Sequence, residues 1–241
     1  MMTAVETHII PTCNFCYSRL RHIFSNNMGE VCETIAFEHG CRCNPMPHGH
    51  SIFVEGTPPL GLFYLNRGKV KLYKRGEGGK KQILRFAQEG DLIGYKALVS
   101  GEVYTATAEV IDDTCLCFIP KDTFFEIITS HPEVSIRVMQ MLTRELKDAE
   151  QAILRLAHKP VRERVATALL TLKQTFGLRA DGATINVELS REDIANIVGT
   201  ATESIIRLLS EFNKDEIIRV SGRKISILDP ERLMRAAYIF D

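Results

Sequence analysis

The sequence contains no tryptophan, and only 7% of its residues are aromatic. It also has no net charge, because 30 Lys and Arg residues balance 30 Asp and Glu residues. A neutral chain has no overall attraction to nucleic acid or membranes, so either partner would need a local charged patch. With 241 residues, 45% of them hydrophobic, the chain can still build one large or two ordinary globular domains.

Long apolar runs are absent as well. No uncharged stretch approaches the roughly 20 residues that a membrane-spanning helix needs. Residues 1–11 lack the basic flank and the apolar run of a secretory signal. We therefore expect a cytoplasmic location and no membrane partner. The sequence also lacks a G-x-S-x-G motif, a P-loop and a zinc-protease helix, so we do not expect an enzyme.

The number of cysteines is odd, which does not suit a disulfide framework in a long chain without an export signal. Free thiols or metal ligands are therefore the expected states of these side chains. The seven cysteines are Cys13, Cys16, Cys32, Cys41, Cys43, Cys115 and Cys117.

Residues 49–120 are divided by glycine and proline into short runs rich in Val, Ile, Leu, Phe and Tyr. Glycine and proline supply turn geometry, and many short strands at this spacing predict a sandwich or a barrel. The expected strands are Ser51 to Val54, Leu62 to Leu65, Val70 to Tyr73, Gln82 to Phe86, Leu92 to Ile93, Ala106 to Ile111 and Cys115 to Ile119.

An apolar seam with alternating steps of three and four residues follows Pro132. This pattern predicts a helix from about Glu133 to His158, roughly 39 Å long at 1.5 Å per residue. The narrow stripe favours a partner helix in a homodimer, and the alternative is packing against the chain's own β domain. Pro160 is expected to end the helix or bend it, and it marks a domain boundary. The seam consists of Met139, Leu142, Leu146, Ala149, Ile153 and Leu156.

A pair of short helices is predicted near the C-terminus. Ser190, followed three residues later by Asp193, resembles a capping box and predicts a short helix that Gly199 ends. A second helix, Ala201 to Asn213, begins with the same pattern at Thr200. Two short helices joined by a tight glycine turn predict a helix-turn-helix.

The outward face of the second helix carries Thr202, Glu203, Ile206 and Arg207. An arginine can bond guanine O6 and N7, a carboxylate can accept from cytosine N4, and an apolar side chain can meet a thymine methyl. The position of these residues in the first turns of the helix favours a contact with a DNA major groove over an ordinary solvated face.

Two further elements flank this helix pair. Val161 to Phe176 is predicted to form a helix before it. A β-hairpin is expected after it, from Ile217 to Leu228 with a turn at Ser221 to Arg223, and it adds a wing. Arg223 and Lys224 lie at or near the tip of the wing, where cations can approach DNA phosphates.

The order of glycine-rich β-roll, long helix and winged helix-turn-helix resembles the Crp/Fnr family of bacterial transcription regulators. The motifs that carry the resemblance are GLFYLNRGKVKLYK (61–74), EGDLIGYKAL (89–98), FIPK (118–121) and LSREDIANIVGTATESIIRLLSEF (189–212). They imply an α+β fold whose β-roll is of the cyclic-nucleotide-binding jelly-roll type. The implied domains are a sensor domain over 1–131, a dimerisation helix over 132–159 and a DNA-binding domain over 160–241.

In this family the second helix reads a TGA-type half-site through a Glu and an Arg four residues apart, which match Glu203 and Arg207. Ile206 stands at the position just before that arginine, which differs between subfamilies. The resemblance implies a homodimer that binds a palindromic operator in double-stranded DNA and works with RNA polymerase. Its two half-sites would lie roughly 34 Å apart on one face of the duplex. The other expected DNA contacts are Thr200, Thr202, Arg223 and Lys224.

Family members that bind cyclic nucleotides carry a Glu after the letters IG and an Arg-Ser pair about ten residues later. The matching positions hold Tyr95, Tyr104 and Thr105. No arginine lies between Arg85 and Arg137, so a buried cyclic phosphate would lack its cationic partner. We therefore expect an effector other than cyclic AMP.

The oxygen-sensing branch of the family ligates an iron-sulfur cluster with three N-terminal cysteines and a fourth before the letters IP. The matching positions hold Cys13, Cys16, His22 and Cys117. Three thiolates and one histidine suit an iron-sulfur cluster or zinc. The chain would then be a redox or oxygen sensor, or a metal sensor with weakened DNA binding. Alternatively, the cysteines are vestigial and remain reduced.

A second and looser ligand group combines Cys41 and Cys43 with His48 and His50, because residues two apart share a face of a strand. Ordinary strand and turn residues are the alternative for this group. Cys115 is expected to fill the core beside Cys117.

Overall fold

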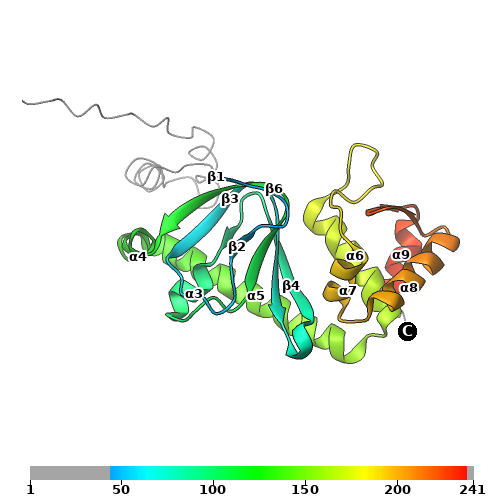
Figure 1. Cartoon of the computed structure of the whole chain (residues 1–241), viewed down its shortest axis with the longest axis horizontal. Coiled ribbons are helices and arrows are strands. Elements are labelled where there is room, and N and C mark those ends of the chain that lie inside the picture. Colours follow the sequence, from blue (N-terminus) through cyan, green and yellow to red (C-terminus); the bar gives the residue numbers. More distant parts are fainter. Residues whose placement is uncertain (1–43, 238–241) are drawn as a thin grey trace, which may run out of the picture.

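The structure is a computed structural model and describes residues 44–237 (Figure 1). A β-roll comes first, a group of helices with a small β-hairpin comes last, and one long helix connects them. In the β-roll the strands pair in the order β1-β6-β3-β4, with β2 on β6 and β5 on β3. Their bounds are β1 (Asn44–Met46), β2 (Ser51–Phe53), β3 (Gly61–Arg75), β4 (Lys81–Gln88), β5 (Leu92–Ile93) and β6 (Thr107–Pro120).

Two long antiparallel strands, β3 and β6, form the frame of the β-roll, where the sequence predicted four shorter ones. Register shifts between Leu65 and Val70 bend β3 without ending it. Gly68 lies in this irregular part with φ of 107°, and a Cβ atom there would collide with the side chain of Thr114. This glycine allows the two strands to approach closely and does not mark a turn, which is why the prediction divided the strand.

The interior of the β-roll holds two apolar clusters. One contains Leu65, Val70 and Leu116. The other contains Leu62 and Tyr64 and lies against two helices, α4 (Lys121–Ser130) and the start of α5 (Pro132–His158). Neither α4 nor the shorter α3 (Tyr95–Ser100) was predicted from the sequence, and a single 3-10 turn (Glu77–Gly79) joins β3 to β4.

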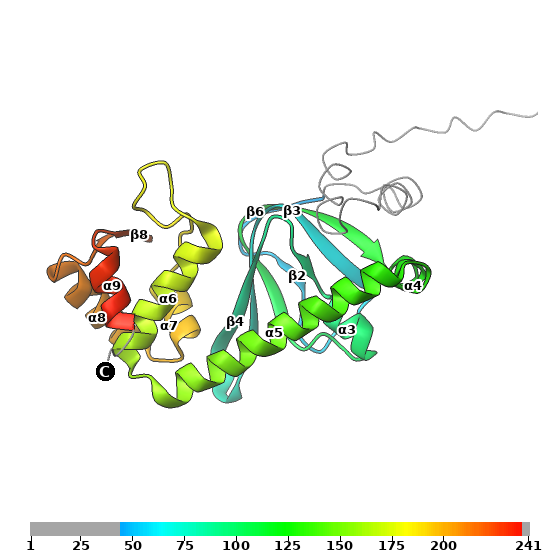
Figure 2. The ribbon, with the colours of Figure 1, turned by 180° about the vertical axis from the view of Figure 1, so that it is seen from behind.

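The long helix α5 runs along the β-roll and continues beyond it to the C-terminal helices (Figure 2). Its buried residues are Val134 and Val138, near its start. Further along, the apolar side chains of Met139, Leu146 and Ile153 are 57%, 61% and 65% exposed. The predicted long helix is confirmed, and most of its apolar seam faces solvent in the single chain.

The C-terminal helices pack around one apolar core, in which Leu169, Ile194, Ile205 and Phe212 are fully buried. The predicted winged helix-turn-helix is confirmed, and α9 is an additional helix that the sequence analysis did not find. The elements are α6 (Val161–Phe176), α7 (Arg191–Val198), α8 (Thr202–Lys214), β7 (Ile218–Ser221), β8 (Lys224–Ile227) and α9 (Pro230–Ala237).

Among residues 44–237, no helix combines the length and the apolar character that crossing a membrane would require.

Candidate nucleic-acid interface

The first helix of the pair, α7, begins with the capping box that the sequence predicted. The backbone N–H of Asp193 donates to Ser190 Oγ at 3.0 Å, and the backbone N–H of Ser190 donates to Asp193 Oδ2 at 3.2 Å. Caps of this kind stabilise a helix by about 0.5–2 kcal/mol. At the other end, Gly199 adopts φ of 70° and donates to the carbonyl of Ala195, so α7 ends after two turns.

The second helix, α8, begins differently from the prediction. Its N-cap is Ala201, and no side chain caps it, so Thr200 and Glu203 do not form a second capping box. The backbone N–H of Thr200 instead donates to the carbonyl of Ala195 and helps to close the turn between the helices. The hydroxyl of Thr200 is therefore not committed to a cap, and it lies half-buried at the start of α8.

One face of α8 is buried, and the opposite face is open to solvent. Ile205, Leu208, Leu209 and Phe212 anchor the helix in the C-terminal core. The exposed stripe repeats at the helical period and contains three of the four residues predicted to face DNA, together with two that were not singled out, whereas Thr202 is half-buried. The members of the stripe are Glu203, Ile206, Arg207, Ser210 and Lys214.

Arg207 is 70% exposed, and its guanidinium donates to the Glu211 carboxylate at 3.3 Å. Glu211 also accepts from Arg162 at 3.2 Å. An exposed ion pair four residues apart on a helix contributes only about 0.2–0.5 kcal/mol, so a DNA base can compete for Arg207 at small cost. Within the described chain Glu203 makes no ion pair, which leaves its carboxylate available as an acceptor.

The wing places further cations near this stripe. Strands β7 and β8 pair antiparallel, and Arg223 and Lys224 are exposed at the turn between them. Arg191 of α7 donates to the carbonyl of Gly222 at 2.9 Å, so the wing tip is fastened to the helix pair. Both views show α8 at the end of the molecule that faces away from the β-roll, with the wing beside it (Figures 1 and 2).

In the β-roll, tyrosines occupy two of the three positions at which cyclic-nucleotide-binding members of the family carry their ligand-binding residues. Tyr104 is 5% exposed, stacks on Phe53 with ring centroids 4.1 Å apart, and donates to the carbonyl of Gly61 at 2.8 Å. Tyr95 is 1% exposed and donates to the Glu145 carboxylate of α5 at 2.6 Å. Burial is the main reason why the pKa of each phenol is raised, so both remain neutral donors at physiological pH.

Glu145 connects this part of the β-roll to the long helix. Besides Tyr95, it contacts Arg85 at 3.2 Å and Lys96 at 2.7 Å. Burial alone would raise the pKa of Glu145, but Arg85, Lys96 and Tyr95 outweigh that effect and lower the pKa. The carboxylate therefore stays ionised and holds α5 against the β-roll.

The proposed metal ligands are only partly within the described chain. Cys13, Cys16 and His22 lie outside residues 44–237, as do Cys32, Cys41 and Cys43. Among the residues that the structure describes, no three His, Cys, Asp or Glu side chains form a group that could hold a metal ion. His48 is exposed, and its Nδ1 donates to the carbonyl of Ile111 at 2.6 Å.

Cys115 and Cys117 are buried on β6, as expected for core residues. Both are disulfide-bonded in the structure, which differs from the expectation that the cysteines are free thiols or metal ligands. The odd number of cysteines and the lack of an export signal describe the chain as a whole. They carry no information about which individual sulfurs come close enough to bond in the fold.

Comparison with known proteins agrees with this architecture. The cyclic nucleotide-binding domain profile matches residues 44–131, and the Crp-like helix-turn-helix domain profile matches residues 163–236. The chain is 31% identical over 197 residues to a fumarate and nitrate reduction regulatory protein of Vibrio cholerae, covering 81% of this chain and 78% of that protein. It is also 31% identical to a CRP-like cAMP-activated global transcriptional regulator of Mycobacterium tuberculosis, over 79% of this chain and 86% of that protein.

Among solved structures, FixK2 from Bradyrhizobium japonicum superposes with a TM-score of 0.74 at 27% identity, over 83% of this chain and 99% of that one. The relatives are transcription regulators and not enzymes. A β-roll, a long helix and a winged helix-turn-helix in this order, matched along most of their length by these relatives, show that the chain belongs to the Crp/Fnr family of DNA-binding transcription regulators with an effector domain.

Proposed function

We propose that the chain acts as a homodimer that binds a palindromic operator in double-stranded DNA and reads each half-site with α8. One observation carries this proposal: Glu203, Ile206 and Arg207 stand exposed on a helix whose opposite face is locked in the core. A helix held in this way can enter a major groove without unfolding, and its side chains match the donor, acceptor and methyl pattern of base edges.

The other predicted contacts support the same mode of binding. Thr200 and Thr202 lie at the start of α8, and Arg223 and Lys224 lie at the exposed wing tip. Hydroxyl and cationic groups around a reading helix position a protein on the phosphates. Family membership leads us to infer a cytoplasmic location and an effect exerted through RNA polymerase.

The long helix supports the homodimer. Its seam residues Met139, Leu146 and Ile153 are more than half exposed in the single chain, and Ala149 is exposed as well. A second copy of the same helix would cover them and would bring two α8 helices to the same side of a duplex.

The effector is proposed to be a molecule other than cyclic AMP. Tyr95 and Tyr104 are buried and hydrogen-bonded at the positions where cyclic-nucleotide binders carry polar and cationic groups. Arg85, which lies close by, is already paired with Glu145. A buried cyclic phosphate would therefore meet neutral phenols and an ionised carboxylate, which do not offset the cost of removing its charge from water.

A labelled duplex with two inverted TGA-containing half-sites tests both statements by fluorescence anisotropy. We expect the purified protein to prefer this duplex over a scrambled one by roughly a thousandfold, and cyclic AMP to leave the dissociation constant unchanged. A specific complex that forms only with cyclic AMP would contradict the effector proposal. Equal affinity for the scrambled duplex would contradict the DNA-reading proposal.

A second candidate function, redox sensing, is favoured by one observation. Cys117 is fully buried beneath α4 and α5, and its sulfur is in a disulfide. A metal ligand must be a thiolate, which a disulfide sulfur is not. Cys117 can therefore either form a disulfide or join a metal site with Cys13, Cys16 and His22, but it cannot do both at once. Such a set would hold zinc or an iron-sulfur cluster only in the reduced protein.

Anaerobic purification followed by iron, sulfide and zinc analysis decides whether this candidate holds. We expect about one metal site per chain in the reduced protein, its loss in Cys13→Ser and Cys117→Ser, and its retention in Cys115→Ser, the matched control on the same strand. Metal-free reduced protein that binds the duplex as well as the oxidised protein does would rule out the redox function and leave DNA binding untouched.

A further inference from the structure

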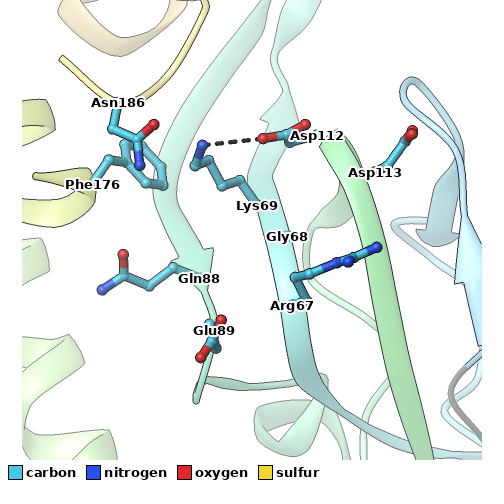
Figure 3. A pocket seen from close by; sticks show the side chains of 9 residues that line it. All are labelled: Arg67, Gly68, Lys69, Gln88, Glu89, Asp112, Asp113, Phe176 and Asn186. Atoms are coloured by element: carbon cyan, nitrogen blue, oxygen red, sulfur yellow. Dashed lines mark hydrogen bonds and ion pairs between the residues drawn. The ribbon is translucent and has the colours of Figure 1, made fainter. Parts of the chain in front are cut away.

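The C-terminal helices contact the β-roll at one interface, in which β3 and β4 face α6 and α7. The rings of Phe86 on β4 and Phe176 on α6 contact each other edge to face, with centroids 5.4 Å apart. Beside them lies a polar pocket of about 490 Å³, lined from both parts of the molecule (Figure 3). The ammonium of Lys69 lies next to Phe176 in this pocket, but its ion pair is with Asp112 of the β-roll itself.

An interface that is partly apolar and partly open to water fixes the relative orientation of two domains only weakly. Additional directional contacts are needed if the helix-turn-helix is to be held in one orientation. The structure provides them at α7.

The short helix α7 is fastened to the β-roll at both of its ends. At its start, the ammonium of Lys71 on β3 donates to Asp193 Oδ1 at 2.7 Å. At its end, the side-chain amide of Gln82 on β4 donates to the carbonyl of Ile197 at 3.3 Å. Two attachment points at opposite ends of a rigid element define its direction, which a single contact would not.

The Lys71 contact is a buried ion triad. The side chain of Lys71 is 11% exposed, and it also contacts Glu109 Oε1 of β6 at 2.8 Å. Both carboxylates are 17% exposed, and Lys81 approaches Glu109 at 3.5 Å. Asp193 divides its two oxygens, because Oδ2 accepts from Ser190 in the capping box while Oδ1 accepts from Lys71.

The protonation states agree with a charged triad. Burial alone would lower the pKa of Lys71, but hydrogen bonds to Asp193 and Glu109 outweigh burial and raise it. Burial alone would raise the pKa of each carboxyl, but the contact with Lys71 lowers both. All three groups are therefore ionised at neutral pH, and removing Lys71 leaves the largely buried carboxylate of Asp193 without its cation.

The direction of α7 determines how α8 is presented. The two helices pack against each other and are joined by the tight turn at Gly199. That turn lies close to the β-roll and to α5, because a Cβ atom at Gly199 would be 3.3 Å from Gln82 Oε1 and 3.0 Å from a methyl of Leu156. In a dimer, the distance between two α8 helices would depend on how each α7 is held.

We propose that Lys71, a β-roll residue distant from the exposed stripe of α8, is a positioning residue for DNA recognition. By binding the Asp193 carboxylate that caps α7, Lys71 sets the orientation of the helix-turn-helix and thereby the half-site spacing that the dimer prefers. This inference rests on the proposed dimeric binding of a palindrome. It adds a determinant of operator geometry that makes no contact with DNA.

The test is a series of labelled duplexes in which the spacer between two inverted TGA-containing half-sites changes by one base pair at a time. The wild-type protein is expected to prefer one spacer. For each protein we divide the dissociation constant for spacers one base pair longer or shorter by that for the best spacer. In Lys71→Met this ratio should fall at least about threefold, because a helix-turn-helix held less firmly against the β-roll populates several orientations. Asp193→Asn, which can keep the capping geometry but loses the charge, should show the same change.

Two controls separate positioning from general damage. Lys71→Arg keeps a cation beside Asp193 and should restore the spacer preference. Lys69→Met removes the neighbouring lysine on the same strand, whose ion pair stays within the β-roll, and should behave as the wild type does. Affinity for a duplex with one half-site should be equal in all variants, because the α8 surface is unchanged.

The possible failures are distinguishable. If the wild-type protein does not distinguish any of these duplexes from a scrambled one, the proposed function fails. If it does, and Lys71→Met and Asp193→Asn keep the full spacer preference while remaining folded by circular dichroism, the positioning role of Lys71 is wrong. Should Lys71→Met not fold, the comparison of Asp193→Asn with Lys71→Arg still decides the question.

Discussion

Replacing Arg207 by alanine is expected to weaken binding to the palindromic duplex by about 1–3 kcal/mol per half-site and to relax discrimination at one base pair of each half-site. The guanidinium is 70% exposed on the open face of α8, and its ion pair is with Glu211. Loss of that exposed pair changes the free energy of unfolding by only about 0.2–0.5 kcal/mol. The effect should therefore appear in DNA binding and not in the melting temperature.

Two matched arginine variants make this measurement specific. Arg223→Ala at the wing tip should weaken binding to all sequences equally and lower the slope of log affinity against log salt by about 1, as for a phosphate contact. Arg75→Ala removes an exposed arginine from the end of β3 and should have no effect. Competition with duplexes mutated one base pair at a time measures the difference. Unchanged discrimination by Arg207→Ala would show that another residue of α8 reads the base.

The winged helix-turn-helix could be predicted from the sequence because its signals are local. A capping residue and its partner are three positions apart, glycine ends α7, and apolar residues repeat at the helical period in α8. The bounds predicted for α6 agree with the structure, and those for α8 differ by one residue at each end. Even so, the cap predicted at Thr200 is absent, because the turn between the helices uses its backbone in a different way.

The β-roll was predicted less well because its determining contacts are distant in sequence. Gly68 reads as a turn signal in the sequence, but it serves a close approach to Thr114 on another strand. The helices α3 and α4 are only six and ten residues long, which is too short for a clear periodic pattern. The number and length of the strands could therefore not be predicted from the glycine and proline positions alone.

Contacts between the β-roll and the helix-turn-helix were outside the reach of sequence reasoning. Lys71 and Asp193 are 122 residues apart, and nothing in the sequence near Lys71 distinguishes it from Lys69 and Lys74 on the same strand. Asp193 was recognised only as a helix cap, which accounts for one of its two oxygens. The sequence thus indicated the reading surface, while the residue proposed to orient that surface emerged only from the fold.

Replacing Leu146 by lysine is expected to convert the proposed homodimer into a monomer. Leu146 lies in the middle of the seam on α5 and is 61% exposed in the single chain, so its burial has to come from a partner. Burying a leucine side chain contributes about 1.5–3 kcal/mol, and a symmetric interface contains the residue twice. The variant should therefore lose roughly 3–6 kcal/mol of association free energy, which corresponds to a dissociation constant raised by about two to four orders of magnitude.

Sedimentation equilibrium over a range of protein concentrations measures this change. Leu60→Lys is the matched control, because Leu60 is 77% exposed but lies on a loop of the β-roll outside the seam, and this variant should remain dimeric. The Leu146→Lys monomer should keep its affinity for a single half-site and lose the gain that comes from joining two half-sites on one duplex. A Leu146→Lys protein that stays dimeric would show that the two chains associate through another surface, and the exposed seam of α5 would then need a different partner.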